Sequence, residues 1–86
     1  MAGREGDPVE ITVDRELDLK GEVCPFTFVK TKLMLEMMEP GQVLRVIVDH
    51  PPAVESVPRS VEAEGNEVLG VAPRGERQWE ILVRRK

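Results

Sequence analysis

The chain has 86 residues with 12 basic and 16 acidic side chains, and its formal net charge is −4 at pH 7. This length fits one domain with a single small core, and the acidic balance argues against non-specific binding of nucleic acid. The one cysteine rules out an internal disulfide, and no apolar stretch approaches the roughly 18 residues that a membrane-spanning helix needs. Residues 1–10 lack the apolar run of a secretion signal, so we expect a cytoplasmic protein.

The N-terminal part divides into a polar segment and a strand. Residues 1–10 are mostly small, polar or charged, and we expect a flexible tail there, followed by a single domain over residues 11–86. Apolar side chains then alternate with polar ones, which is the period of a β-strand. We predict this strand over residues 17–19, with residues 11–13 as an extension or an edge segment and with Gly21 as its end.

A helix is predicted over residues 25 to about 39, where Pro40 and Gly41 end it. Apolar residues occur on two sides of this helix, and one of the two sides belongs to the core. The first side holds Phe28, Thr31, Leu35 and Met38, and the second holds Phe26, Val29, Leu33 and Met37. The side outside the core is either covered by another element or exposed beside Cys24, where it would suit a protein partner.

A strand and a second helix follow. Residues 43–49 are almost continuously apolar and β-branched, which is typical of a central strand. A helix is predicted over residues 53–64, with Asp49 or His50 near its cap. Because a proline removes a helical hydrogen bond, we predict a break or kink just before Pro58.

The last part of the chain predicts two strands joined by a turn. Residues 68–71 and 79–83 carry alternating apolar side chains, and the residues between them include a proline and a glycine. The element order is therefore β-α-β-α-β-β. It predicts an α+β fold, a two-layer α/β sandwich with a four-stranded mixed sheet and both helices on one face.

Cys24 stands directly before the first predicted helix, with Pro25 next to it. We predict Cys24 as the N-cap and Pro25 as the first helical residue, because proline has no N–H to leave unpaired there. The free amides and the helix dipole would lower the pKa of the thiol from the value of about 8.5 for free cysteine. Cys24 is therefore a candidate nucleophile, and the alternative is a small buried residue without chemistry.

Other polar residues near Cys24 have less specific interpretations. Lys20 is close in sequence and would lower the thiol pKa further, whereas Glu22 would act in the opposite direction. His50 is either a base for Cys24 or, as we favour, a capping residue at a helix start. One cysteine and one histidine do not supply the ligands of a zinc site, so we predict neither a metal nor a cofactor.

The sequence resembles the TusA/SirA-type sulfur-carrier proteins. The resemblance is carried by residues 16–25, which end in the cysteine-proline pair, by the spacing from Cys24 to Pro40 and Gly41, and by the strand over residues 43–49. It implies a βαβαββ sandwich similar to the C-terminal domain of bacterial translation initiation factor three. It also implies that Cys24 carries sulfur as a persulfide, as a sulfurtransferase-type carrier.

Partners and site residues follow from the same resemblance. Such proteins take sulfur from a cysteine desulfurase or a rhodanese and give it to an acceptor protein in tRNA thiolation, molybdenum-cofactor supply or sulfur metabolism. We predict that Cys24 is the catalytic residue. The predicted supporting residues are Lys20, Gly21, Pro25, Phe26 and Thr27, and the predicted partner-binding residues are Phe26, Val29, Lys30 and Leu33.

Thr27 departs from the family pattern, in which a second proline is typical three residues after the cysteine. Threonine keeps an N–H that proline lacks, so the sulfur of Cys24 could accept one more hydrogen bond. The alternative function is a non-catalytic interaction or regulatory module that binds a protein through the apolar surface of the first helix. RNA binding by analogy of fold is a weaker third hypothesis, which the acidic charge opposes.

Overall fold

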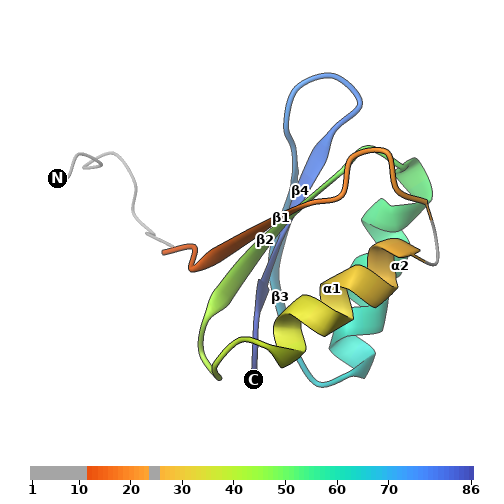
Figure 1. Ribbon diagram of the computed structural model, residues 1–86. Coiled ribbons are helices and arrows are strands. Elements are labelled where there is room, and N and C mark those ends of the chain that lie inside the picture. Colours follow the sequence, from red (N-terminus) through yellow and green to blue (C-terminus); the bar gives the residue numbers. More distant parts are fainter. Residues whose placement is uncertain (1–11, 24–25) are drawn as a thin grey trace, which may run out of the picture.

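A computed structural model of the protein describes residues 12–23 and 26–86. These residues form four strands and two helices in the predicted order (Figure 1). The elements are β1 (Arg15–Asp18), α1 (Phe26–Glu36), β2 (Val43–Val48), α2 (Pro51–Ala63), β3 (Glu67–Pro73) and β4 (Trp79–Arg84). The predicted tail, residues 1–10, lies outside the described residues.

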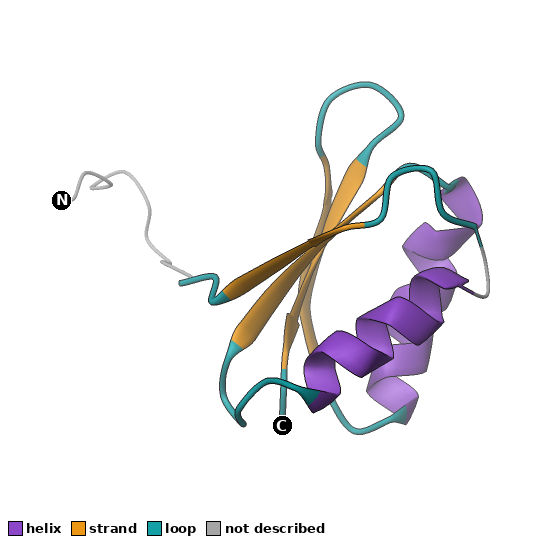
Figure 2. Cartoon of the chain, in the orientation of Figure 1, coloured by secondary structure: helices purple, strands orange, loops and turns teal. Residues whose placement is uncertain are grey.

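The sheet is mixed and has the strand order β1-β2-β4-β3. β1 pairs in parallel with β2, and β4 lies between β2 and β3, antiparallel to both. Both helices lie on the same face of this sheet (Figures 1 and 2). The predicted two-layer sandwich with a four-stranded mixed sheet is therefore confirmed.

The core lies between the helices and the sheet, and β2 and α2 each contribute three residues to it. Leu44, Val46 and Val48 are fully buried at alternate positions of this strand, as expected for a central strand. They pack with Leu19, Leu35, Met38, Ala53, Val57, Val61, Ile81 and Val83. Arg45 lies on the opposite face of the sheet, where its guanidinium is 3.5 Å from Glu16 and 3.6 Å from Glu80.

Of the predicted break or kink in the second helix, the break is wrong, because α2 continues through Pro58. Ala53, Val57 and Val61 recur every fourth residue and are buried on one side of α2, on both sides of the proline in sequence. Their common packing in the core holds the two halves of the helix together, although Pro58 cannot donate to a carbonyl in the preceding turn. Beyond Ala63, Gly65 has a φ of 95° and donates to Glu62, which is the expected helix stop.

The ends of the first two elements differ from the prediction. β1 begins at Arg15. Just before it, the Asp14 side chain takes the place of a backbone acceptor: its carboxylate accepts the N–H of Val43, the first residue of β2, at 2.8 Å. Thr12 and Val13 are not in a strand, and residue 11 lies outside the described residues. α1 ends at Glu36, three residues before the predicted end, because the next two amides bond to carbonyls three residues back and tighten the last turn. Neither described helix, of 11 and 13 residues, is long and apolar enough to cross a membrane.

Candidate functional site

The segment before α1 begins with a tight turn. The N–H of Glu22 donates to the carbonyl of Leu19 at 3.0 Å, and Gly21 has a φ of 90°. A positive φ at the third residue of a turn is the geometry that favours glycine there. Gly21, a predicted supporting residue, thus shapes the chain three residues before Cys24.

Two hydrogen bonds attach this turn to the end of β2. The N–H of Leu19 donates to the carbonyl of Ile47 at 2.8 Å, and the N–H of Gly21 donates to the Asp49 carboxylate at 2.9 Å. The N-cap of α2 is His50, whose side chain makes no capping hydrogen bond. The histidine therefore has the predicted position at the helix start, while the Asp49 side chain holds the turn.

Cys24 and Pro25 lie outside the described residues, so their predicted roles as N-cap and first helical residue stay predictions. On either side of them, the carbonyl of Val23 accepts the N–H of Phe26 at 2.8 Å and the N–H of Thr27 at 3.3 Å. A hydrogen bond from Thr27 to sulfur, as proposed from the sequence, would have to compete with this carbonyl. The Thr27 side chain is buried, and the backbone carbonyl of Thr27 accepts a hydrogen bond from the Thr31 hydroxyl at 2.7 Å.

Lys20, the predicted cation near the cysteine, and Lys30, a predicted partner-binding residue, are both paired with carboxylates. The Lys20 ammonium is 3.5 Å from Asp18, and the Lys30 ammonium is 2.8 Å from Glu22. The backbone N–H of Lys20 also donates to Asp18, and this hydrogen bond, with the Lys20 charge, lowers the pKa of the Asp18 carboxyl. Within the described part of the chain, no group of His, Asp and Glu side chains could hold a metal ion.

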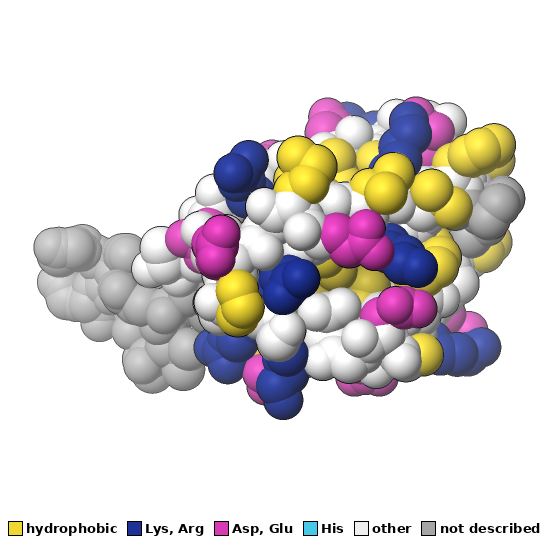
Figure 3. All heavy atoms as spheres, turned by 60° about the horizontal axis from the view of Figure 1, so that its bottom comes forward, with side chains coloured by type: hydrophobic (Ala, Val, Ile, Leu, Met, Phe, Trp, Pro, Cys, Tyr) yellow, Lys and Arg dark blue, Asp and Glu magenta, His cyan; other side chains and the backbone are white. Residues whose placement is uncertain are grey.

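An exposed apolar ridge runs from the loop along α1. It consists of Val23, Phe26, Val29, Leu33 and Met37, whose exposed fractions are 48%, 56%, 43%, 54% and 68%. The opposite side of the helix is the core side, with Thr31, Leu35 and Met38 buried. Of the two alternatives for the second apolar side of this helix, exposure is therefore correct. Figure 3 shows apolar side chains gathered on the helical side of the molecule, among charged ones.

Three of the four predicted partner-binding residues, Phe26, Val29 and Leu33, belong to the ridge, and the fourth, Lys30, lies on the same helix. Val23 was not predicted to belong to this surface, because it precedes the predicted helix. The role of Asp49 was not predicted either, since a contact across 28 positions gives no periodic signal. The pairing of Lys30 with Glu22 was likewise not predicted.

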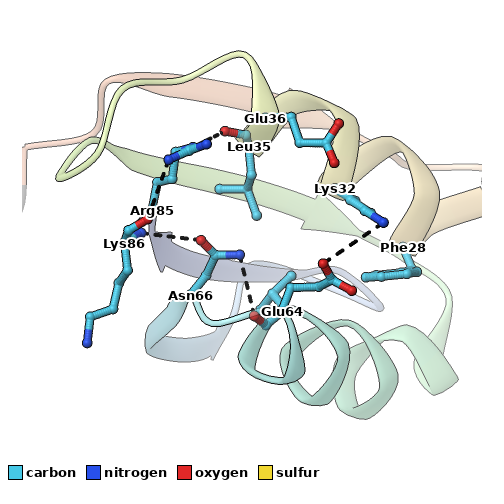
Figure 4. Close-up of a pocket in the computed structure, with 9 residues that line it drawn as sticks. Phe28, Lys32, Leu35, Glu36, Glu64, Asn66, Arg85 and Lys86 are labelled. Carbon is cyan, nitrogen blue, oxygen red and sulfur yellow. Dashed lines mark hydrogen bonds and ion pairs between the residues drawn. The ribbon is translucent and has the colours of Figure 1, made fainter.

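A hollow of about 190 Å³ lies beside the C-terminal half of α1. Phe28, Lys32, Leu35, Glu36, Val61, Glu64, Asn66, Arg85 and Lys86 line it (Figure 4). Its polar groups largely contact one another: Arg85 donates to the Leu35 carbonyl at 2.6 Å, and Lys32 is 3.9 Å from Glu64. These contacts join the end of the chain to both helices and do not involve a predicted site residue.

Residues 15–85 match the protein family described as sulfurtransferase TusA. A protein of Archaeoglobus fulgidus, provisionally named a sulfur carrier, is 55% identical over 96% of this chain and 94% of the relative. A protein of Thermotoga maritima with the same provisional name is 40% identical over 86% of this chain and 94% of its own length. These matches confirm the resemblance that the sequence predicted.

More distant relatives extend the likeness. YedF of Escherichia coli, also provisionally named a sulfur carrier, is 31% identical over 76% of this chain and 84% of its own length. The crystal structure of a SirA-like protein from Desulfitobacterium hafniense superposes with a TM-score of 0.72 at 24% identity, covering 81% of this chain and 95% of that one. At this identity the likeness is one of fold.

Proposed function

The chain belongs to the sulfurtransferase TusA family, and on that premise we propose that it is a cytoplasmic sulfur carrier that accepts and donates a persulfide sulfur on Cys24. The observation that carries the proposal is the position of the cysteine in the sequence, inside the matched region and directly beside an exposed apolar ridge. A cysteine that exchanges sulfur with other proteins needs a surface on which those proteins can dock. The ridge has the residue types of such a surface.

The proposed chemistry needs one thiolate and no cofactor. The Cys24 thiolate attacks the outer sulfur of a donor persulfide, the sulfur–sulfur bond of the donor breaks, and the donor cysteine leaves as a thiolate. Cys24 then carries the additional sulfur as its own persulfide, with no net oxidation or reduction. The thiolate of an acceptor, or another nucleophile, attacks this outer sulfur in the second step and restores the Cys24 thiolate.

We propose the ridge and Lys30 as the docking surface for a cysteine desulfurase or rhodanese and for the acceptor protein. Phe26, Val29 and Leu33 expose about half of their surfaces, so a partner can cover them without unfolding any element. Lys30 is 48% exposed and pairs with Glu22, which leaves both groups accessible to a partner's charges. The acceptor determines whether the sulfur goes to tRNA thiolation, molybdenum-cofactor supply or another branch of sulfur metabolism.

Mass spectrometry tests the sulfur transfer. The purified chain is incubated with a cysteine desulfurase and cysteine, and in parallel with a rhodanese and thiosulfate. We expect the mass to rise by one sulfur atom, located on Cys24 and removed by a reducing thiol. The Cys24→Ser variant should stay unmodified, and failure to load Cys24 from both donors would contradict the proposal.

The alternative is a non-catalytic module that binds a protein through the ridge, and the exposure of the ridge is the observation that favours it. The two proposals differ in what the cysteine contributes. For a module, Cys24→Ala leaves partner binding and the cellular phenotype intact, while Leu33→Glu removes both. For a sulfur carrier, Cys24→Ala retains binding but loses the phenotype.

A further inference from the structure

We infer that Asp49 is a positioning residue for Cys24, acting through the hydrogen bond from Gly21; the inference rests on the proposed sulfur chemistry for its biological role. Asp49 follows β2 directly, and its carboxylate oxygen lies 2.9 Å from the Gly21 nitrogen, 28 positions earlier in the chain. The bond thus joins the end of the central strand to the segment that leads into the cysteine.

The hydrogen bond continues the pairing of β1 with β2. The two strands are parallel, with Asp18 paired to Ile47, and the N–H of Leu19 still donates to the Ile47 carbonyl. Along a parallel ladder, donors on one strand meet acceptors on the other at every second residue. The next donor is Gly21 and the next acceptor position is Asp49, so the Asp49 side chain supplies one more rung after the strands end.

The turn makes the Gly21 amide available for this bond. The hydrogen bond that closes the turn runs from Glu22 to Leu19 and does not use the Gly21 N–H. With its φ of 90°, Gly21 turns the chain away from the sheet. The Asp49 carboxylate therefore fixes the turn at the residue where the chain leaves the sheet on its way to Cys24.

A second contact attaches the segment before Cys24 to α1, the helix that follows the cysteine. Glu22, the residue after Gly21, pairs with Lys30 at 2.8 Å, and Lys30 lies on α1 beyond the cysteine. Asp18 and Lys20 hold the beginning of the same turn. The bond from Leu19 to Ile47 attaches the first residue of the turn to β2, and the bond to Asp49 attaches its third residue to the end of the same buried strand.

Two variants of Asp49 separate its hydrogen bond from its charge. Asp49→Ala removes the acceptor, whereas Asp49→Asn keeps an acceptor oxygen and removes the charge. The matched control is Asp14→Ala. Asp14 also accepts a β1–β2 backbone amide, that of Val43 at 2.8 Å, but at the other end of the strand pair.

The readout is the pH profile of Cys24 alkylation by iodoacetamide, which reports the thiolate without any sulfur donor. In Asp49→Ala we expect the midpoint to rise by about half a pH unit or more, toward the value of free cysteine, because the turn that leads to the predicted N-cap position loses its attachment to the end of β2. The profile of Asp49→Asn should stay close to that of the wild type. The profile of Asp14→Ala should be unchanged even where its melting temperature falls as far as that of Asp49→Ala.

Three outcomes would overturn the inference: an unchanged profile in Asp49→Ala, equal shifts in the Ala and Asn variants, or the same shift in Asp14→Ala. Sulfur loading from a desulfurase is measured on the same variants, and Asp49→Ala should load several-fold more slowly than Asp49→Asn. If Cys24 accepts no sulfur in any variant while the alkylation profiles differ as expected, the proposed function fails and the positioning role of Asp49 stands. If loading occurs but the profiles coincide, only the positioning role fails.

Discussion

The two helices cover the same face of the sheet but present different outer surfaces. α2 buries Ala53, Val57 and Val61 and exposes charged residues, including the pair Glu55 and Arg59, 3.9 Å apart. α1 also buries one side, yet its outer side exposes the apolar ridge formed by Val23, Phe26, Val29, Leu33 and Met37.

The difference between the two outer sides indicates that an apolar outer side is not needed for a helix to pack on this sheet. α2 is an ordinary amphipathic helix whose polar side faces water. The packing of α2 shows that a helix on this face of the sheet can contribute one side to the core while its outer side is charged. The exposed parts of the apolar residues of α1 therefore do not pack in the sandwich, and their grouping beside Cys24 in the sequence favours a binding role.

The strongest test of this comparison places a charge on the ridge. Leu33→Glu and Val29→Glu should weaken binding to a sulfur donor or acceptor by about tenfold or more, because burying an unpaired carboxylate in an apolar interface is unfavourable. Calorimetric titration with the partner measures the loss. Arg59→Gln on the outer side of α2 lowers the net charge by the same amount and should bind like the wild type; equal losses in both helices would refute the distinction.

The next prediction concerns stability. Val57→Ala should lower the free energy of unfolding by about 2 kcal/mol, because it leaves a cavity in the core. Val29→Ala, which makes the same chemical change on the ridge, should change it by less than about 0.5 kcal/mol. Urea unfolding followed by circular dichroism measures both values. A large loss in Val29→Ala would mean that the ridge contributes to folding after all.

A smaller effect is expected at Pro58, which lies inside α2. Pro58→Ala should raise the free energy of unfolding by about 1 kcal/mol, because alanine restores a helical hydrogen bond, an effect partly offset by the greater freedom of the unfolded chain. Thermal and urea unfolding measure the change. A decrease would show that the half-buried proline ring contributes more by packing than it costs the helix.

The smallest effect concerns the segments that lead into the helices. α2 begins without a side-chain cap, whereas the turn before α1 depends on Asp18, whose pKa is lowered from 3.8 mainly by the N–H of Lys20. A lowered pKa adds stability at pH values above 3.8, and this stability is lost as the pH falls through the folded-state pKa. Comparing Asp18→Asn with the wild type, the difference in unfolding free energy should be constant above about pH 5 and shrink in more acidic solution. A difference independent of pH would contradict this.

Periodicity in the sequence was sufficient for the architecture but not for the details of the site. The continuous apolar run of β2, the alternation in the other strands and the helical spacing in α1 predicted the elements, their order and the two-layer arrangement. Of the break or kink predicted before Pro58, the break was wrong, because the local cost of a proline was weighed without the buried residues on both sides of it. Whether the second apolar side of α1 was covered could not be decided, since neither the period nor the composition of a helix reveals what packs against it.

The bond between Gly21 and Asp49 illustrates the same limit for the site. The sequence placed Asp49 near a helix cap, a local role, because capping patterns lie within a few residues. Its partner is 28 positions away and is adjacent only after β1 and β2 have paired. The cysteine itself was identified by a local motif, and the residue that we infer to position it was visible only in three dimensions.

The edges of the sheet have a consequence for behaviour in solution. β1 has only four residues, three of them charged, and the other edge strand, β3, has a bulge between Val68 and Gly70 and ends at Pro73. Short, charged, bulged or proline-terminated edges resist pairing with strands of other molecules, which is the first step toward fibrils. The protein can therefore expose an apolar helix surface to partner proteins at high concentration, while the edges of its sheet resist pairing with other copies of the chain.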